Sequence, residues 1–167
     1  MDLEYTTFQT SKILGIKYGR LREWIDRGDI IPSVSKADGQ GTKTIFSKTD
    51  LYLIGLFAYL IDRKIFTRKE AAERVRQVSQ YKKVTKSWSD VDSHYCIAFY
   101  FRKEGYLGNG KQKSLPWAKI FSKDNVIQKS LNDLLFQESE YYYSDFDDVT
   151  VVNFRKIIEK IDAAIEH

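Results

Sequence analysis

Two short stretches near the start of this 167-residue chain place apolar residues at helical spacing. The first covers residues 8–14, where Thr7 suits the N-cap and Gly15 suits a left-handed C-terminal turn. The second runs over about Tyr18 to Arg27 and ends at a glycine, shortly before a proline that prevents any helical continuation. Its inward face is predicted to consist of Leu21, Trp24 and Ile25.

The segment 34–46 predicts a β-hairpin. Its two ends are β-prone, and the sequence DGQG at residues 38–41 is a strong turn signal because glycine tolerates positive φ. We therefore expect two short strands joined by a tight turn, directly after the second helix.

Two helices with capping signals follow the hairpin. Residues 47–50 (SKTD) resemble a capping box with Asp in place of Glu, and they predict a helix to about Asp62. This helix is apolar on nearly all sides, so we expect it to be buried on more than one. Residues 67–70 (TRKE) form a complete capping box that opens another helix.

The second half of the chain predicts a small mixed domain after a polar linker at residues 82–93. Residues 94–103 are β-branched and aromatic on both faces, which predicts a buried strand. A second strand is expected within 111–121, a helix over about 124–138, and a third strand at 141–143.

The C-terminal stretch admits two interpretations. Val149 to Val152 is β-branched and Asn153 suits an N-cap, which favours a strand followed by a helix. Apolar residues at three-four spacing from Val151 to Ile165 instead favour one continuous amphipathic helix. We prefer the strand followed by the helix.

Together these elements predict an α+β fold in two domains. Residues 1–81 read as a mainly helical winged helix-turn-helix, because helix, turn, helix, hairpin and capped helix follow one another in that order. Residues 82–93 are expected to link it to a small α+β effector or dimerisation domain over 94–167, ending in a helix.

Charge is distributed unevenly between the halves. Residues 1–86 hold 17 Lys and Arg against 10 Asp and Glu, a formal charge of +7, and residues 87–167 carry −3. A basic N-terminal half followed by a mildly acidic C-terminal half is typical of a phosphate-binding module joined to a domain with another function.

The outward face of the second helix, the hairpin tip and the start of the helix at residues 67–70 supply the candidate DNA contacts, although Arg68 in the last of these is equally compatible with a surface role. Arginine binds guanine or clamps phosphates, and a tyrosine hydroxyl reaches phosphate, although most charged faces are simply solvated. The predicted DNA-binding residues are Lys17, Tyr18, Arg20, Arg22, Arg27, Lys36, Gln40, Thr42, Lys43 and Arg68.

The first half resembles the DNA-binding domain of the MerR (mercury-resistance regulator) family from Tyr5 to about Val78. The resemblance is carried by the helix 16–28, the exit 30–32, the hairpin end 41–43, and the sequence from Phe46 into the following helix pair. It implies DNA contacts at Tyr18, Arg20, Arg22, Thr42 and Lys43. It also implies that the last helix belongs to a dimer contact, whereas the sequence equally allows packing inside its own domain.

Chemistry for catalysis or metal binding is not apparent. No nucleophile motif, phosphate loop or metal-ligand cluster stands out, and the single cysteine, Cys96, lies in an apolar stretch typical of a core. No run approaches the ~18 apolar residues of a membrane helix. The aromatic second half is compatible with a pocket for an apolar effector, but such residues more often form core.

These observations predict a sequence-specific DNA-binding transcriptional regulator that acts as a dimer, with helix 18–27 in the major groove and the wing 34–46 on the backbone. We expect no enzymatic activity, metal or cofactor, and a cytoplasmic, nucleoid-associated protein of a bacterium. The expected partners are double-stranded DNA, a second copy through the C-terminal domain, and RNA polymerase, but no membrane. The alternative is an excisionase-like architectural or recombination-directionality protein.

Overall fold

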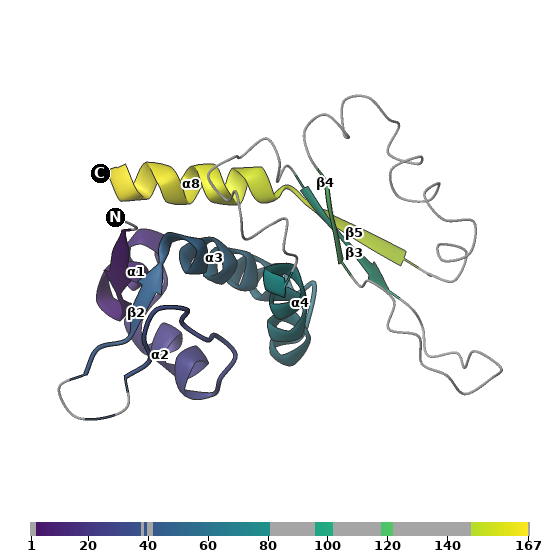
Figure 1. Cartoon of the computed structure of the whole chain (residues 1–167). Coiled ribbons are helices and arrows are strands. Elements are labelled where there is room, and N and C mark those ends of the chain that lie inside the picture. Colours follow the sequence, from purple (N-terminus) through teal and green to yellow (C-terminus); the bar gives the residue numbers. More distant parts are fainter. Residues whose placement is uncertain are drawn as a thin grey trace. The chain divides into compact units, whose positions relative to one another are not determined.

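The computed structural model describes residues 3–37, 39, 42–80, 96–101, 118–121 and 148–166. It has an α+β fold of helices with two antiparallel sheets, drawn in Figure 1. The chain divides into two compact units, of which unit 1 is Met1–Ser79 with Lys156–His167 and unit 2 is Gln80–Arg155. The elements are β1 (Glu4–Thr6), α1 (Thr7–Leu14), α2 (Tyr18–Asp26), β2 (Ile45–Ser47), α3 (Lys48–Asp62), α4 (Arg68–Gln80), β3 (Cys96–Phe101), β4 (Ala118–Phe121), β5 (Asp148–Val152) and α8 (Phe154–Glu166).

Unit 1 begins with a short strand that fixes the start of α1. β1 pairs antiparallel with β2, with Tyr5 opposite Phe46. The N-cap of α1 is Thr6 and not Thr7 as predicted, because the strand holds Thr6 in the extended conformation that a cap requires. Thr6 Oγ1 accepts from the Gln9 backbone N–H at 3.3 Å, and Gln9 Oε1 accepts from the Thr6 N–H at 2.9 Å.

Helix α2 has the inward face that its apolar spacing predicts. Leu21, Trp24 and Ile25 are buried, and the ring of Trp24 meets that of Phe57 edge to face with centroids 4.9 Å apart. After the helix, Gly28 has a φ of +74°, a conformation that residues with a side chain rarely adopt. The chain therefore turns sharply between α2 and the segment that follows.

The segment 34–46 forms a hairpin with less backbone pairing than the two strands that the sequence predicts. Ser35 and Ile45 exchange backbone hydrogen bonds at 3.2 and 2.8 Å, but this is an isolated bridge, and β2 pairs with β1. Beyond the bridge, Thr44 Oγ1 accepts from the Ala37 N–H at 3.2 Å. A threonine side chain thus replaces a backbone partner, so a regular ladder does not continue through the described residues. Residues 38, 40 and 41 lie outside them.

Both predicted capping boxes are present. Ser47 and Asp50 cap α3 reciprocally, and α3 is buried on several sides through residues such as Leu51, Leu56 and Leu60. At the start of α4, Glu70 Oε2 accepts from the Thr67 N–H at 2.9 Å while Thr67 Oγ1 accepts from the Glu70 N–H at 3.4 Å. The inner side of α4 buries Ala71, Ala72 and Val78.

The preferred interpretation of the C-terminal stretch, a strand followed by a helix, is confirmed by β5 and α8. From Lys156 onward α8 belongs to unit 1, whereas the sequence led us to place all of it in a domain over 94–167. Its inner side packs on α3, where Gly55 leaves room: a Cβ at Gly55 would lie 2.7 Å from Cδ1 of Ile161 and 3.1 Å from Cγ2 of Ile157.

Polar contacts reinforce the packing of α8 on α3. The hydroxyl of Tyr52 donates to Asp162 Oδ1 at 2.6 Å, and Nζ of Lys48 lies 2.8 Å from the same oxygen. Burial, followed by the hydrogen bond to Asp162, raises the pKa of Tyr52 to about 12. Burial alone would lower the pKa of Lys48, but its hydrogen bonds with Asp162 and Tyr52 raise that pKa to about 12.

Unit 2 contains an antiparallel sheet with strand order β4-β3-β5. The central strand β3 is the core of the strand predicted over 94–103, and β4 lies within the range 111–121 given for the second strand. Cys96, Ile97, Ala98 and Phe99 are buried, and burial raises the pKa of the Cys96 thiol to about 11, as suits a core residue. The predicted linker at 82–93, helix over 124–138 and strand at 141–143 lie outside the described residues.

Candidate nucleic-acid interface

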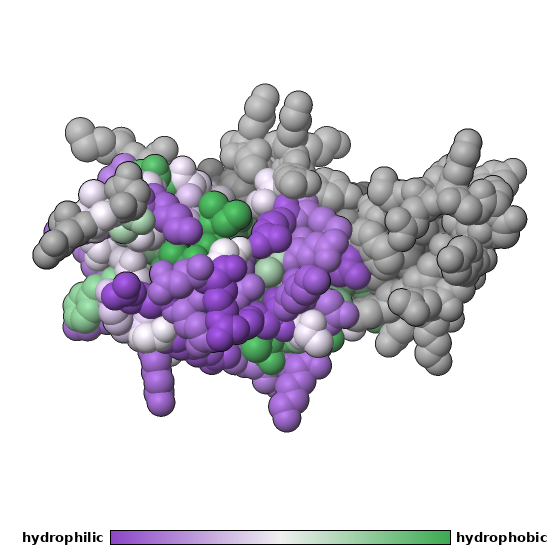
Figure 2. Space-filling view, turned by 90° about the horizontal axis from the view of Figure 1, so that it is seen from below, coloured by the Kyte–Doolittle hydropathy of each residue, from purple (hydrophilic) through white to green (hydrophobic). Residues whose placement is uncertain are grey.

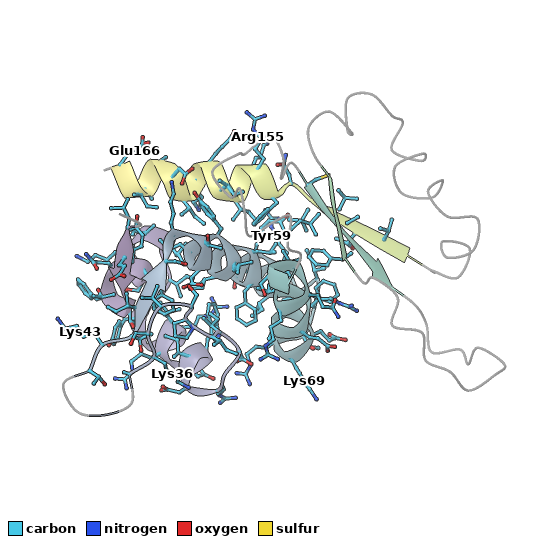
Figure 3. The ribbon with its side chains drawn as sticks, viewed as in Figure 1. Lys36, Lys43, Tyr59, Lys69, Arg155 and Glu166 are labelled. Atoms are coloured by element: carbon cyan, nitrogen blue, oxygen red, sulfur yellow. The ribbon has the colours of Figure 1, made fainter. Side chains whose placement is uncertain are left out.

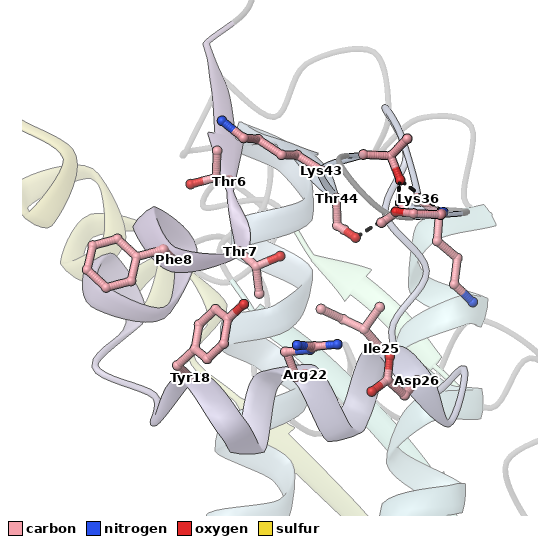
Figure 4. A pocket seen from close by; sticks show the side chains of 13 residues that line it. Thr6, Thr7, Phe8, Tyr18, Arg22, Ile25, Asp26, Lys36, Lys43 and Thr44 are labelled. Atoms are coloured by element: carbon pink, nitrogen blue, oxygen red, sulfur yellow. Dashed lines mark hydrogen bonds between the residues drawn. The ribbon is translucent and has the colours of Figure 1, made fainter.

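An open hollow of about 590 Å³ lies between α2, the start of α1 and the hairpin segment (Figure 4). Most of its lining side chains are polar or charged, and they come from three successive parts of the chain. The lining residues are Thr6, Thr7, Phe8, Tyr18, Arg22, Ile25, Asp26, Lys36, Ala37, Gly39, Thr42, Lys43 and Thr44.

Helix α2 presents Tyr18 and Arg22 to the hollow. They are four residues apart, so they lie one above the other on the same side of the helix. Both are exposed, and Arg22 forms no ion pair with any residue that the structure describes. The buried residues Leu21, Trp24 and Ile25 fix the rotation of the helix, so this side of α2 is directed outward.

The hairpin segment supplies the facing wall. Lys36 and Lys43 project from it, one from each arm (Figure 3). Thr42 Oγ1 accepts from the Gly39 N–H at 3.1 Å and donates to the Gly39 carbonyl at 2.8 Å, so its hydroxyl shapes the turn. Gln40 lies outside the described residues.

The base of the hairpin segment is held by a carboxylate at the start of α3. Asp50 is 6 % exposed, and its Oδ2 accepts from the Ser33 N–H at 3.0 Å, the Ser33 hydroxyl at 2.8 Å and the Ser47 N–H at 2.9 Å. One oxygen therefore joins the cap of α3 to the segment that enters the hairpin. Asp50 positions the wall that carries Lys36 and Lys43.

Three of the predicted arginines have other partners. Arg20 Nη2 lies 2.7 Å from Asp62 Oδ1, with its guanidinium 4.7 Å from the ring centre of Trp24. Arg27 Nε lies 3.1 Å from Glu23 Oε1. The third is Arg68, whose partners are described in the next paragraph. None of these three arginines lines the hollow, in contrast to Tyr18 and Arg22.

Helix α4 holds the end of α2 through two arginines. Arg68 Nη1 lies 3.1 Å from Glu23 Oε1, and its Nε lies 3.0 Å from Asp29 Oδ2 as an ion pair without hydrogen-bond alignment. Arg76 Nη2 donates to the carbonyl of Gly28 at 2.7 Å. The sequence offered Arg68 as a phosphate contact, but its charge is engaged within the fold, while Lys69 beside it projects outward (Figure 3).

Of the ten predicted residues, the structure therefore brings together Tyr18, Arg22, Lys36, Thr42 and Lys43 around one hollow. Lys17 is exposed at the N-cap of α2 but does not line it. Sequence reasoning missed the contribution of α1 and of Asp26. The available signal for Asp26 was its position four residues after Arg22, which places both on one side of α2.

The surface that contains α2 is mainly hydrophilic. Figure 2 views unit 1 from below and shows hydrophilic residues over most of this face, with small hydrophobic patches between them. Exposed apolar side chains near the hollow include Phe8, whose ring lies 4.7 Å from Nζ of Lys12, and Tyr18. Such a surface suits a charged, hydrated partner better than an apolar one.

Within the described parts of the chain, no group of three or more His, Cys, Asp or Glu side chains is placed to hold a metal ion. None of the described helices has the length and apolar character needed to cross a membrane. Comparison with known proteins finds neither a family model nor a curated protein sequence that matches this chain.

Proposed function

We propose that the chain is a sequence-specific DNA-binding transcriptional regulator, with α2 in the major groove and the hairpin segment as a wing on the phosphate backbone. The observation that carries the proposal is the convergence of Tyr18, Arg22, Lys36 and Lys43 on one open hollow. Its other support is the order of the elements, helix, turn, helix, hairpin and capped helices, which is typical of a winged helix-turn-helix of the MerR kind.

The chemistry of these side chains matches the two kinds of DNA contact. An arginine on an exposed helix face donates two hydrogen bonds to O6 and N7 of guanine, each good pair being worth about 1–3 kcal/mol of discrimination. Lysines on a projecting loop neutralise phosphates and give affinity without sequence preference. Arg22 is the residue proposed to read a base, and Lys36 and Lys43 are the residues proposed to hold the backbone.

The regulator is proposed to act as a dimer, which would set the spacing of two half-sites. A second candidate, an architectural or recombination-directionality protein, is favoured by one observation. The inner side of α8 packs on α3 through Ile157 and Ile161, so that apolar side is already used within unit 1. A monomer that bends DNA needs no dimer helix.

Selection from a randomised duplex library with purified protein tests the main proposal. We expect enrichment of a defined sequence, and we expect Arg22→Ala to weaken binding to it by about fivefold or more. The control Arg63→Ala, which replaces an exposed arginine that does not line the hollow, should leave binding unchanged. Failure to enrich any sequence would overturn the proposal. Strong bending of circularly permuted probes by a monomer would favour the second candidate.

A further inference from the structure

One carboxylate lies among the cationic groups of the hollow. Asp26 is exposed on the last turn of α2, and it lines the hollow together with Arg22, one helical turn earlier (Figure 4). Both side chains lie on the side of the helix proposed to face the major groove. A carboxylate here is repelled by phosphate, so its position calls for a hydrogen-bond donor on the partner.

No neighbour within the described part of the chain neutralises Asp26. Arginine and aspartate four residues apart on a helix commonly pair, but Asp26 forms no ion pair with Arg22, and none with Lys36 across the hollow. Glu23, on the neighbouring side of α2, forms ion pairs with both Arg27 and Arg68. Of the two acidic side chains of α2, Glu23 is therefore paired within the fold, whereas Asp26 lines the hollow.

We infer that Asp26 is a specificity-determining residue that accepts a hydrogen bond from an exposed base amino group, preferentially N4 of cytosine, in the DNA proposed above. This inference rests on the proposed function. In the major groove, the amino groups of cytosine and adenine are the donors, and a carboxylate pairs best with cytosine because adenine presents an acceptor beside its donor. Guanine and thymine at this position would place acceptor oxygens against the carboxylate.

The helix geometry sets the distance between Arg22 and Asp26, the two side chains proposed to contact bases. Four residues along an α-helix span about 6 Å, and stacked base pairs are about 3.4 Å apart, so Arg22 and Asp26 reach positions about two base pairs from each other. The inferred site thus contains a guanine contacted by Arg22 and a cytosine about two steps away contacted by Asp26.

Selection from a randomised duplex library, followed by titration of each enriched site with single base-pair replacements, tests the assignment. The proteins compared are the wild type, Asp26→Asn, Arg22→Ala and the matched control Glu73→Gln, which removes an exposed carboxylate from α4. Circular dichroism melting establishes that each variant is folded.

We expect Asp26→Asn to lose a preference of about fivefold or more at one position, about two base pairs from the position that Arg22→Ala relaxes, and to bind unrelated duplexes more tightly than the wild type. Glu73→Gln should select the wild-type sequence. An unchanged motif of unchanged strength in Asp26→Asn overturns the inference while the DNA-binding proposal stands. Absence of any duplex binding by the wild type overturns the proposed function itself, and this assignment with it.

Discussion

The guanidinium of Arg20 on α2 lies 2.7 Å from the carboxylate of Asp62 at the end of α3. It also lies over the ring of Trp24, 4.7 Å from its centre. This contact engages one arginine of the helix with the body of unit 1, while Arg22, two residues later, lines the hollow. The two arginines of one short helix therefore have different expected roles: Arg20 positions the helix, and Arg22 meets the ligand.

The first prediction separates these roles. Arg22→Ala should weaken binding to the selected duplex by about fivefold or more, because each good arginine–guanine contact is worth about 1–3 kcal/mol, and should leave the free energy of unfolding unchanged. Arg20→Ala should lower the free energy of unfolding by about 0.5–1 kcal/mol, as expected for a half-exposed ion pair with an added ring contact, and should weaken binding less. Fluorescence anisotropy and urea unfolding measure the two effects. Equal losses of affinity in both variants would contradict the assignment.

The second prediction concerns the packing of α8 on α3. Gly55→Leu should lower the free energy of unfolding by about 1–3 kcal/mol, because even a Cβ at this position would lie 2.7 Å from Ile161 Cδ1 and a longer side chain displaces α8. Gly19→Ala on α2 is the control, since a Cβ there meets nothing within 4 Å and the change should stabilise by up to about 1 kcal/mol. Urea titration followed by circular dichroism compares them. A fully stable Gly55→Leu variant would show that α8 does not pack closely on α3.

Stability should fall at high pH through the contacts of Asp162. The pKa values of Tyr52 and Lys48 are both raised to about 12, from 10.0 and 10.5, so the folded state binds their protons more tightly than the unfolded chain. The stability that these two protonated groups contribute is fully present below about pH 10, and it is lost as the pH rises from about 10 to 12. Urea midpoints at pH 8 and pH 11 should differ less for Tyr52→Phe than for the wild type. Identical pH dependence in the two proteins would refute this.

The fourth prediction concerns the base of the hairpin. Asp50→Ala removes an acceptor of three hydrogen bonds and should lower the free energy of unfolding by about 2–3 kcal/mol, because the Ser33 and Ser47 N–H groups lose their partner. Glu70→Ala removes the corresponding residue of the exposed cap of α4 and should cost about 1 kcal/mol. A loss for Asp50→Ala no greater than for Glu70→Ala, compared by urea unfolding, would argue against its role as an anchor.

Local signals in the sequence were sufficient for helices α1 to α4 of unit 1, apart from the N-cap of α1. The capping boxes at Ser47 and Thr67, the spacing of Leu21, Trp24 and Ile25, and the turn at Gly15 depend on residues a few positions apart, and the structure contains all of them. Because these interactions join residues close together in the chain, they can be predicted from a single sequence.

Contacts between distant residues were not predictable in the same way. The ion pairs Arg20–Asp62 and Arg68–Glu23 join residues more than 40 positions apart, and Tyr52 contacts Asp162 across 110 positions. Such pairs decide which arginines remain available on the surface and which helix α8 packs against. A charge pattern gives the candidates for a binding face, and only the three-dimensional arrangement divides them into engaged and available groups.

The salt dependence of DNA binding tests the central claim most directly. A fluorescent duplex of mixed sequence is titrated at several salt concentrations with the wild type and with the triple variant Arg22→Ala, Lys36→Ala, Lys43→Ala. Lys64→Ala, Lys69→Ala, Arg63→Ala is the control of equal charge. If the hollow binds DNA, the slope of log K against log salt should decrease in magnitude by about 2–3 in the first triple variant and by less than 1 in the control. Equal slopes in the wild type and the first triple variant, or no binding by the wild type, would contradict the account.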